Sequence, residues 1–184
     1  MRAFIAVPLS DEIRKKIGTF YHEIGFMKGV KEVPVQNLHI TLDFLGDISE
    51  KEAERFSENL KKIASDISPF DLTIKGSGAF PKKSDPKILW LGMTGNKPLV
   101  SLAMQVKDAV DSMDTKRFSP HLTVGRVKYN KDGQQEYFDQ FFQKGDRSFG
   151  RLHVDRFQLM KSDLSGKTPV YTLWKDFRLT GGMK

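Results

Sequence analysis

Apolar residues recur with two different spacings along the chain, and each spacing predicts a different kind of element. Where every third or fourth residue is apolar, the pattern predicts an amphipathic helix with one buried face. Ser10, Ser49 and Asn96 precede three of these patterns, and Ser49 with Glu52 forms a capping-box signature. The apolar positions expected to face inward are Ile13, Ile17, Phe20 and Ile24; Ala53, Phe56, Leu60 and Ile63; Leu99, Leu102, Val106, Ala109 and Met113; and Tyr137, Phe138, Phe141 and Phe142.

Short apolar or alternating runs predict the strands, because successive side chains of a strand point to opposite faces. No connection between the predicted elements is long enough to separate independent domains, so residues 1–184 are expected to form a single α+β domain. The strands are expected at residues 2–7, 39–45, 70–80, 87–93, 121–127, 148–161 and 169–179.

The order strand, helix, histidine-led strand occurs twice. The first copy runs from Phe4 to the strand beginning at His39, and the second runs from Ile88 to the strand beginning at His121. The two starting points lie 84 residues apart and the two histidines 82 residues apart. This nearly constant offset indicates an internal duplication, so we expect two related lobes whose histidine strands face one cleft.

Each histidine strand begins with the pattern His-x-Thr-x. His39 and Thr41 share one face of their strand, as do His121 and Thr123, because residues i and i+2 point the same way. In-line displacement at phosphorus needs one group that accepts a proton from the nucleophile and another that protonates the leaving oxygen, and histidine can do either near neutral pH. Threonine hydroxyls can donate hydrogen bonds to the non-bridging phosphate oxygens. A single such motif is typical of a structural histidine, but two in matched settings favour phosphodiester cleavage.

These segments resemble the 2H phosphoesterase superfamily. The resemblance is carried by HITL at 39–42, HLTVGR at 121–126, the N-terminal RAFIAV strand and the FLGD segment after the first motif. Within the superfamily, the chain resembles over essentially its whole length the bacterial and archaeal RNA 2',3'-cyclic phosphodiesterases, also named 2'-5' RNA ligases. The resemblance implies a bilobal α+β fold of two pseudo-symmetric, interleaved lobes, with antiparallel sheets lining a central cleft and helices outside.

The resemblance also implies a role for each motif residue. His39 corresponds to the proton donor and His121 to the proton acceptor, while Thr41 and Thr123 correspond to the phosphate-contacting threonines. The expected reaction is hydrolysis of RNA 2',3'-cyclic phosphate ends to 2'-phosphomonoesters. Run backwards, the same chemistry would join RNA ends, tRNA halves among them, through a 2'-5' linkage without a nucleotide.

Arg126 matches the arginine that closes the second motif, which makes it a candidate contact for phosphate or nucleotide. Strand alternation opposes this role, because on a regular strand Arg126 lies on the side of Leu122 and Val124 rather than that of the histidine. The role therefore requires the strand to twist or end near Gly125. A solvated arginine at the strand end is the alternative interpretation.

Charge and composition narrow the class of partner. The formal net charge of +7 and the sequence pI of about 9.5 favour contact with polyanions such as RNA, although a lysine-rich surface also serves solubility. The absence of cysteine excludes disulfides, thiolate nucleophiles and cysteine-bound zinc. No apolar run approaches the ~20 residues of a spanning helix, and the N-terminus lacks signal-peptide features. We expect a cytoplasmic monomer with no membrane partner.

Motifs for other chemistries are missing from the sequence. It has no His-Glu-x-x-His zinc motif and no glycine-rich phosphate loop, and Lys131-Asp132-Gly133 differs from the Lys-x-Asp-Gly pattern of nucleotidyl-lysine ligases. We therefore expect neither a metal nor a cofactor.

The remaining histidines and one basic turn are interpreted as surface features. His22 lies beside the apolar stripe of a helix, and His153 is expected to be an exposed strand residue, with a contact to RNA as the alternative. Lys82 and Lys83 are expected to form a solvated turn. Two other functions stay open: a phosphodiesterase acting on small cyclic nucleotides or ADP-ribose cyclic phosphate, and a non-catalytic RNA-binding module.

Overall fold

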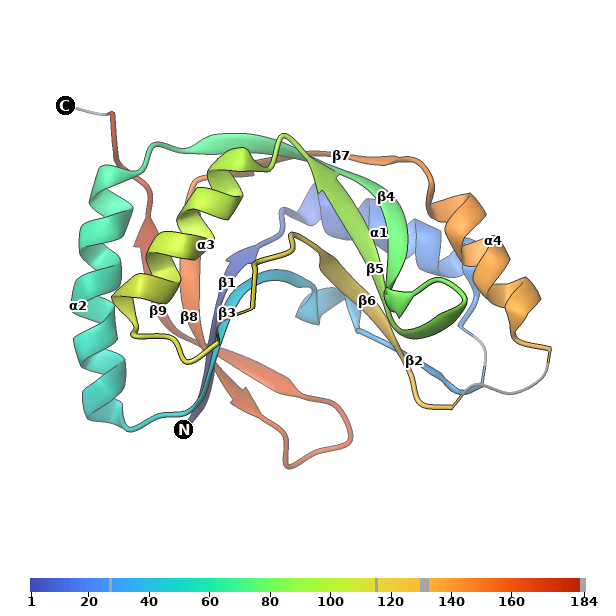
Figure 1. Ribbon diagram of the computed structural model, residues 1–184, viewed down its shortest axis with the longest axis horizontal. Helices are drawn as coiled ribbons and strands as arrows, with labels where there is room; N and C mark the ends of the chain where they lie inside the picture. The colour runs from blue at the N-terminus through green and yellow to red at the C-terminus, as the bar shows by residue number, and fades with distance from the viewer. Residues whose placement is uncertain (27, 115, 130–132, 183–184) are drawn as a thin grey trace.

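Two antiparallel sheets form the centre of the molecule in the computed structural model, which describes residues 1–26, 28–114, 116–129 and 133–182 (Figure 1). Sheet A has the strand order β3-β1-β8-β9, and sheet B has the order β2-β6-β5-β4-β7. The strands are β1 (Arg2–Pro8), β2 (Val30–Glu32), β3 (His39–Asp47), β4 (Phe70–Lys82), β5 (Asp85–Thr94), β6 (Leu122–Val127), β7 (Ser148–Val154), β8 (Arg156–Asp163) and β9 (Val170–Arg178).

Helices cover the outer side of each sheet (Figure 1). Helices α2 and α3 pack against each other and against β9 and β3 of sheet A, whereas α1 and α4 pack against each other and against β7 and β4 of sheet B. The helices are α1 (Asp11–Ile24), α2 (Glu50–Asp66), α3 (Lys97–Ala109) and α4 (Gln135–Gly145), with a 3-10 helix η1 (Val35–Asn37) before β3. The α+β fold predicted from the sequence is confirmed.

The two lobes exchange helices. Helix α1 follows β1 of sheet A in the chain but packs on sheet B, and α3 follows β5 of sheet B but packs on sheet A. The histidine strands occupy matching places, since β3 pairs with β1 and β6 pairs with β5, both antiparallel. Ala6 lies opposite Thr41 in one pair, and Trp90 lies opposite Thr123 in the other. The duplication seen in the sequence is thus present in the pairing of the strands.

Local signals in the sequence account for the helix starts. The Ser10 hydroxyl accepts a hydrogen bond from the Ile13 amide at 3.3 Å and caps α1. Ser49 and Glu52 form the predicted capping box at the start of α2. Most of the predicted apolar positions of the four helices are buried in one core, while Ile24, Ile63, Ala109, Tyr137 and Phe142 are half-buried at its margin.

Two sequence-based predictions about the elements are wrong. Met113 does not face inward: α3 ends at Ala109, the backbone at Asp111 enters the left-handed region with φ of 50°, and the Met113 side chain is 94% exposed. Residues 148–161 are not one strand, because the chain passes from β7 in sheet B to β8 in sheet A at Asp155. The buried positions shift by one residue at the junction, from Leu152 and Val154 to Phe157 and Leu159, and the prediction of a single strand overlooked this break.

No described helix has the length and apolar character needed to cross a membrane. Lys131 and Asp132, which distinguish this chain from the nucleotidyl-lysine ligases, lie outside the described residues.

Candidate active site

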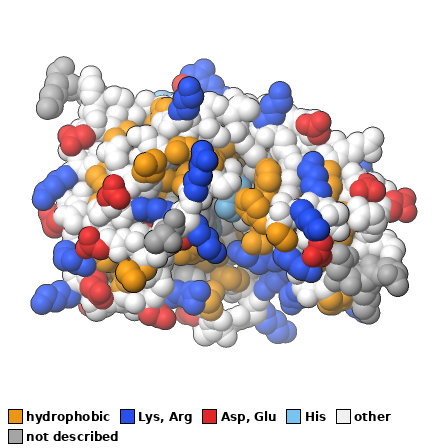
Figure 2. All heavy atoms as spheres, in the orientation of Figure 1, with side chains coloured by type: hydrophobic (Ala, Val, Ile, Leu, Met, Phe, Trp, Pro, Cys, Tyr) orange, Lys and Arg blue, Asp and Glu red, His pale blue; other side chains and the backbone are white. Residues whose placement is uncertain are grey.

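A cleft of about 470 Å³ lies between the two sheets and brings both motifs together. Figure 2 shows a histidine at the bottom of a central hollow, with hydrophobic, lysine and arginine side chains around it. All five residues predicted for the site line this cleft: His39, Thr41, His121, Thr123 and Arg126. His39 and Thr41 lie on β3 of sheet A. Thr123 and Arg126 lie on β6 of sheet B, and His121 is the residue directly before β6.

Both histidines are oriented by the same kind of contact. His39 Nδ1 lies 2.7 Å from the carbonyl oxygen of Asn37, and His121 Nδ1 lies 2.7 Å from the carbonyl oxygen of Ser119. Because a carbonyl oxygen can only accept, Nδ1 carries the proton in each neutral ring and donates to it. Nε2 is therefore the nitrogen of each imidazole that can take up or release a proton.

Burial keeps both imidazoles neutral in the free protein. For His39, burial lowers the pKa to about 4; the bond to Asn37 opposes this shift, and Arg14 and Arg126 add to it. Two aromatic rings enclose His39, with Phe4 stacked at 4.7 Å and Tyr171 edge-on at 5.4 Å between ring centroids. Burial also lowers the pKa of His121, and Arg126 acts in the same direction.

A bulge in β6 explains how Arg126 reaches the cleft. In the pairing of β5 with β6, Leu89 lies opposite Gly125 and Trp90 lies opposite Thr123, so Val124 is an extra residue without a partner. Val124 and Gly125 are consecutive buried residues, and the alternation resumes one position later. Arg126 therefore points to the side of Thr123 and lines the cleft. The alternation of a regular strand would have put it on the opposite face.

Strand β3 has a bulge at the equivalent position. Ile5 lies opposite Asp43 and Ala6 lies opposite Thr41, so Leu42 is the unpaired residue, three positions after the histidine, as Val124 is in β6. The shift turns Phe44 into the cleft, where its side chain is 65% exposed. Four further cleft residues were not predicted from the sequence, because neither motif includes them and one of them lies near the far end of the chain: Phe4, Asn37, Phe44 and Tyr171.

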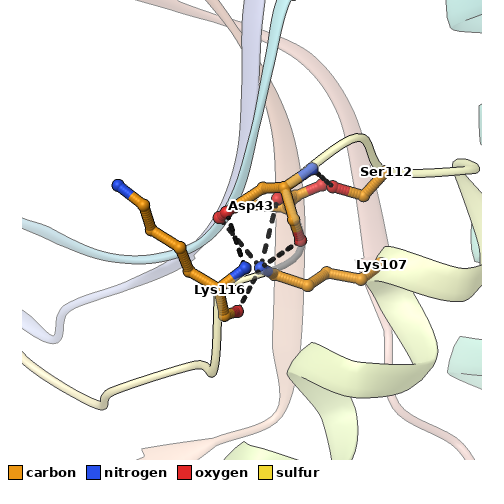
Figure 3. A network of polar contacts seen from close by, with 5 residues as sticks. Asp43, Lys107, Ser112 and Lys116 are labelled. Atoms are coloured by element: carbon orange, nitrogen blue, oxygen red, sulfur yellow. Dashed lines mark hydrogen bonds and ion pairs between the residues drawn. The ribbon is translucent and has the colours of Figure 1, made fainter.

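A partly buried ionic cluster binds the loop that precedes His121 (Figure 3). Lys107, at the end of α3, directs Nζ at Asp114 Oδ2 at 2.9 Å, at the Asp114 carbonyl at 3.1 Å and at the Lys116 carbonyl at 3.2 Å. Asp43 Oδ1 lies 4.0 Å from the same Nζ, and Asp43 is only 2% exposed. Burial raises the pKa of Asp43, and the Ser112 hydroxyl and Lys107 offset part of that shift. The cluster links the first histidine strand to the approach to the second.

The residues interpreted as surface features lie outside the cleft lining. His22 is exposed, and the His153 side chain is 63% exposed with Nδ1 2.8 Å from an oxygen of Asp71. Lys82 and Lys83 are exposed at the β4–β5 turn. Among the described residues, no three histidine, aspartate or glutamate side chains are grouped so that they could hold a metal ion.

Comparison with known proteins agrees with this architecture. Residues 12–166 match the family model described as the 2'-5' RNA ligase superfamily. The RNA 2',3'-cyclic phosphodiesterase of Archaeoglobus fulgidus is 37% identical over 97% of this chain and 99% of its own length. TT0787 of Thermus thermophilus superposes with a TM-score of 0.82 at 28% identity, over 99% of this chain and 100% of the other. E. coli LigT, solved with NADP+, superposes with a TM-score of 0.79 at 25% identity, over 97% of this chain and 98% of the LigT chain. With two histidine strands facing one cleft and a family match over most of its length, the chain belongs to the 2'-5' RNA ligase superfamily of 2H phosphoesterases.

Proposed function

We propose that the protein hydrolyses RNA 2',3'-cyclic phosphodiester ends to 2'-phosphomonoesters by acid–base catalysis with two histidines. The observation that carries the proposal is the pair of imidazoles lining one cleft, each with Nδ1 bound to a backbone carbonyl and Nε2 left for proton transfer. Relatives named RNA 2',3'-cyclic phosphodiesterase, which match this chain over nearly its full length, support the substrate class.

The negative charge of the substrate favours protonation of one of the two imidazoles, which the reaction requires. Both imidazoles are neutral in the free protein at neutral pH because burial lowers their pKa values. A phosphodiester carries a negative charge, which favours the protonated form of an imidazole placed beside it. Binding of the anion therefore promotes uptake of one proton by the pair, so that one ring is an acid while the other remains a base.

The reaction then needs one acid and one base on opposite sides of phosphorus. His121 accepts a proton from water as the water oxygen bonds to phosphorus, and His39 donates its proton to O3' as the P–O3' bond breaks. The phosphate remains on O2'. Thr41 and Thr123 donate hydrogen bonds to the non-bridging oxygens, and Arg126 adds positive charge where negative charge develops. The assignment of donor and acceptor rests on the family resemblance, since the two histidines are held alike.

The same geometry serves a joining reaction, which differs from hydrolysis only in its nucleophile. An RNA 5'-hydroxyl that replaces water and loses its proton to His121 would form a 2'-5' linkage, with no nucleotide consumed. Halves of a cleaved tRNA present the required pair of ends. A monomer is sufficient for either reaction, because one chain supplies both histidines of the cleft.

A cleft of about 470 Å³ is also large enough for a small cyclic nucleotide or ADP-ribose cyclic phosphate. The net charge of +7 favours a longer polyanion. The deciding experiment incubates the protein with an oligonucleotide ending in a 2',3'-cyclic phosphate, in parallel with 2',3'-cyclic AMP and ADP-ribose cyclic phosphate, and resolves the products. We expect the largest kcat/KM for the oligonucleotide. Salt-sensitive RNA binding without turnover would instead identify a non-catalytic binding module.

A further inference from the structure

The β8–β9 hairpin forms one wall of the cleft. Ser162, Leu164, Pro169 and Tyr171 of this hairpin line the cleft, and Tyr171 packs edge-on against the His39 ring. The hairpin extends from sheet A beyond the body of the molecule (Figure 1). Since its outer part has few neighbours within its own sheet, contacts from other elements must hold it over the cleft.

Two side chains from outside the hairpin, one in η1 and one in β2, bind its outer part. Asn37 Nδ2 donates a hydrogen bond to the Pro169 carbonyl at 2.8 Å, and Lys31 Nζ donates to the Lys167 carbonyl at 2.7 Å. The Asn37 bond is partly buried, whereas the Lys31 bond is exposed and competes with water. Asn37 is therefore the stronger of the two tethers.

Asn37 has a second contact, which connects the tether to the reacting groups. Its own carbonyl oxygen accepts the hydrogen bond from His39 Nδ1 at 2.7 Å. One residue thus binds the hairpin through its side chain and the imidazole through its backbone. Ser119, which plays the backbone role for His121, has no such side-chain bond in the described part of the chain.

We propose that Asn37 is a positioning residue that couples docking of the β8–β9 hairpin to the placement of His39, by keeping Tyr171 against the imidazole. This proposal rests on the proposed function for its kinetic consequence. Its structural part stands on the contacts alone. Within the described residues, no side chain plays this part for His121, so the coupling acts on one member of the pair.

The charged groups around His39 come from separate elements, and the tether controls only one of its neighbours. Arg14 of α1 and Arg126 of β6 both lower the pKa of His39, and neither belongs to the hairpin. Release of the hairpin removes Tyr171 and admits water, which reduces the burial that is the main cause of the low pKa. The pKa of His39 should then rise toward the ordinary value of ~6.5, while that of His121 stays the same.

The test replaces Asn37 by Leu, which has a similar size and no donor, and follows both histidines by NMR titration. We expect Asn37→Leu to raise the pKa of His39 but not that of His121, with His39 still protonated on Nδ1 in the neutral ring. We also expect kcat to fall by about 10-fold with KM changed by less than about 3-fold, because a positioned proton transfer is worth ~10²–10⁴-fold in rate. If Asn37→Leu does not fold, Asn37→Ala provides the same measurement.

Asn59→Leu is the matched control. Asn59 Nδ2 donates to the Ala109 carbonyl at 3.0 Å in a partly buried contact between α2 and α3, far from the cleft. Asn59→Leu should lower the free energy of unfolding by about as much as Asn37→Leu does. It should leave the pKa of His39 and kcat unchanged. An Asn37→Leu variant whose His39 titrates as in Asn59→Leu would overturn the proposal.

A double-mutant cycle with Tyr171→Leu examines the route of the coupling. If Asn37 acts through the hairpin, adding Asn37→Leu to Tyr171→Leu should produce little further change in the pKa of His39. Fully additive shifts would contradict the proposed route. Since the NMR titration needs no turnover, an inactive protein with the expected shifts would refute the proposed function and leave the coupling intact.

Discussion

Phe44 and Arg126 occupy equivalent places on the two histidine strands, five residues after His39 and His121 and just beyond a one-residue bulge. Both line the cleft, one from each lobe. The two His-x-Thr-x motifs in the cleft are nearly symmetric, but the flanking position is apolar on one strand, at Phe44, and cationic on the other, at Arg126. This difference gives an asymmetric substrate a way to bind in one orientation.

Replacing Arg126 by Met should weaken the binding of the anionic substrate and raise the pKa of both histidines, because Arg126 lowers both. We expect kcat/KM to fall at least 10-fold, which is about 1.4 kcal/mol of transition-state stabilisation. Arg126→Lys keeps the charge and should recover part of the loss. Kinetics at two salt concentrations and NMR titration measure both effects, and unchanged histidine titration in Arg126→Met would contradict the assignment.

His39→Ala and His121→Ala should each reduce kcat by about 10²–10⁴-fold while leaving the circular dichroism spectrum unchanged. The double variant should be little worse than either single one, because groups that act as a unit are not additive. Near-normal turnover by either single variant would show that its imidazole takes no part in the reaction.

Acidification should destabilise the protein through His39. Its pKa is about 4 in the folded protein and ~6.5 when unfolded, so the unfolded chain binds more protons between these values and stability falls as the pH falls through this window. From pH 7 to pH 5 the loss attributable to His39 is about 2 kcal/mol. Urea unfolding at the two pH values measures it, and His39→Asn should show a correspondingly smaller loss. An equal loss in both proteins would show that His39 is not the responsible group.

Replacing Lys107 by Met should destabilise the fold by about 3 kcal/mol, because it leaves the Asp43 carboxylate buried without its cation. Asp43→Asn in the same protein should restore part of that stability. Lys87→Met, which breaks an exposed pair with Asp85, is the control and should change stability by less than about 1 kcal/mol. Equal effects of Lys107→Met and Lys87→Met, measured by urea unfolding, would rule out a special role for the contact between Lys107 and the buried Asp43.

Hydrolysis should continue at full rate in excess EDTA, because the proposed mechanism assigns both proton transfers to the two imidazoles and the phosphate contacts to Thr41, Thr123 and Arg126, which all line the cleft. The measurement is the initial rate before and after chelation. Loss of activity that a divalent ion restores would show that the reaction uses a metal after all.

The local signals in the sequence were sufficient to predict most of the elements and to predict that the two motifs share one cleft. Helix caps at Ser10 and Ser49 and the apolar spacing behind them act within a few residues, so they can be recognised before the fold is known. The two His-x-Thr-x motifs needed only strand alternation to predict that each histidine shares a face with its threonine. Their repeated setting was enough to predict one shared cleft.

Tertiary structure decided what depends on a partner strand or on residues far away in the chain. Arg126 reaches the cleft because pairing with β5 leaves Val124 as an extra residue, and strand pairing is not encoded in the alternation of one strand. At Asp155 the alternation shifts by one residue, but only the pairing shows that the chain changes sheet there. His39 has a low pKa because Phe4 and Tyr171, from opposite ends of the chain, enclose it. The sequence by itself determined the two motifs and the face of the strand that each presents, and only the packing of distant segments determined the orientation of the two imidazoles and their pKa values.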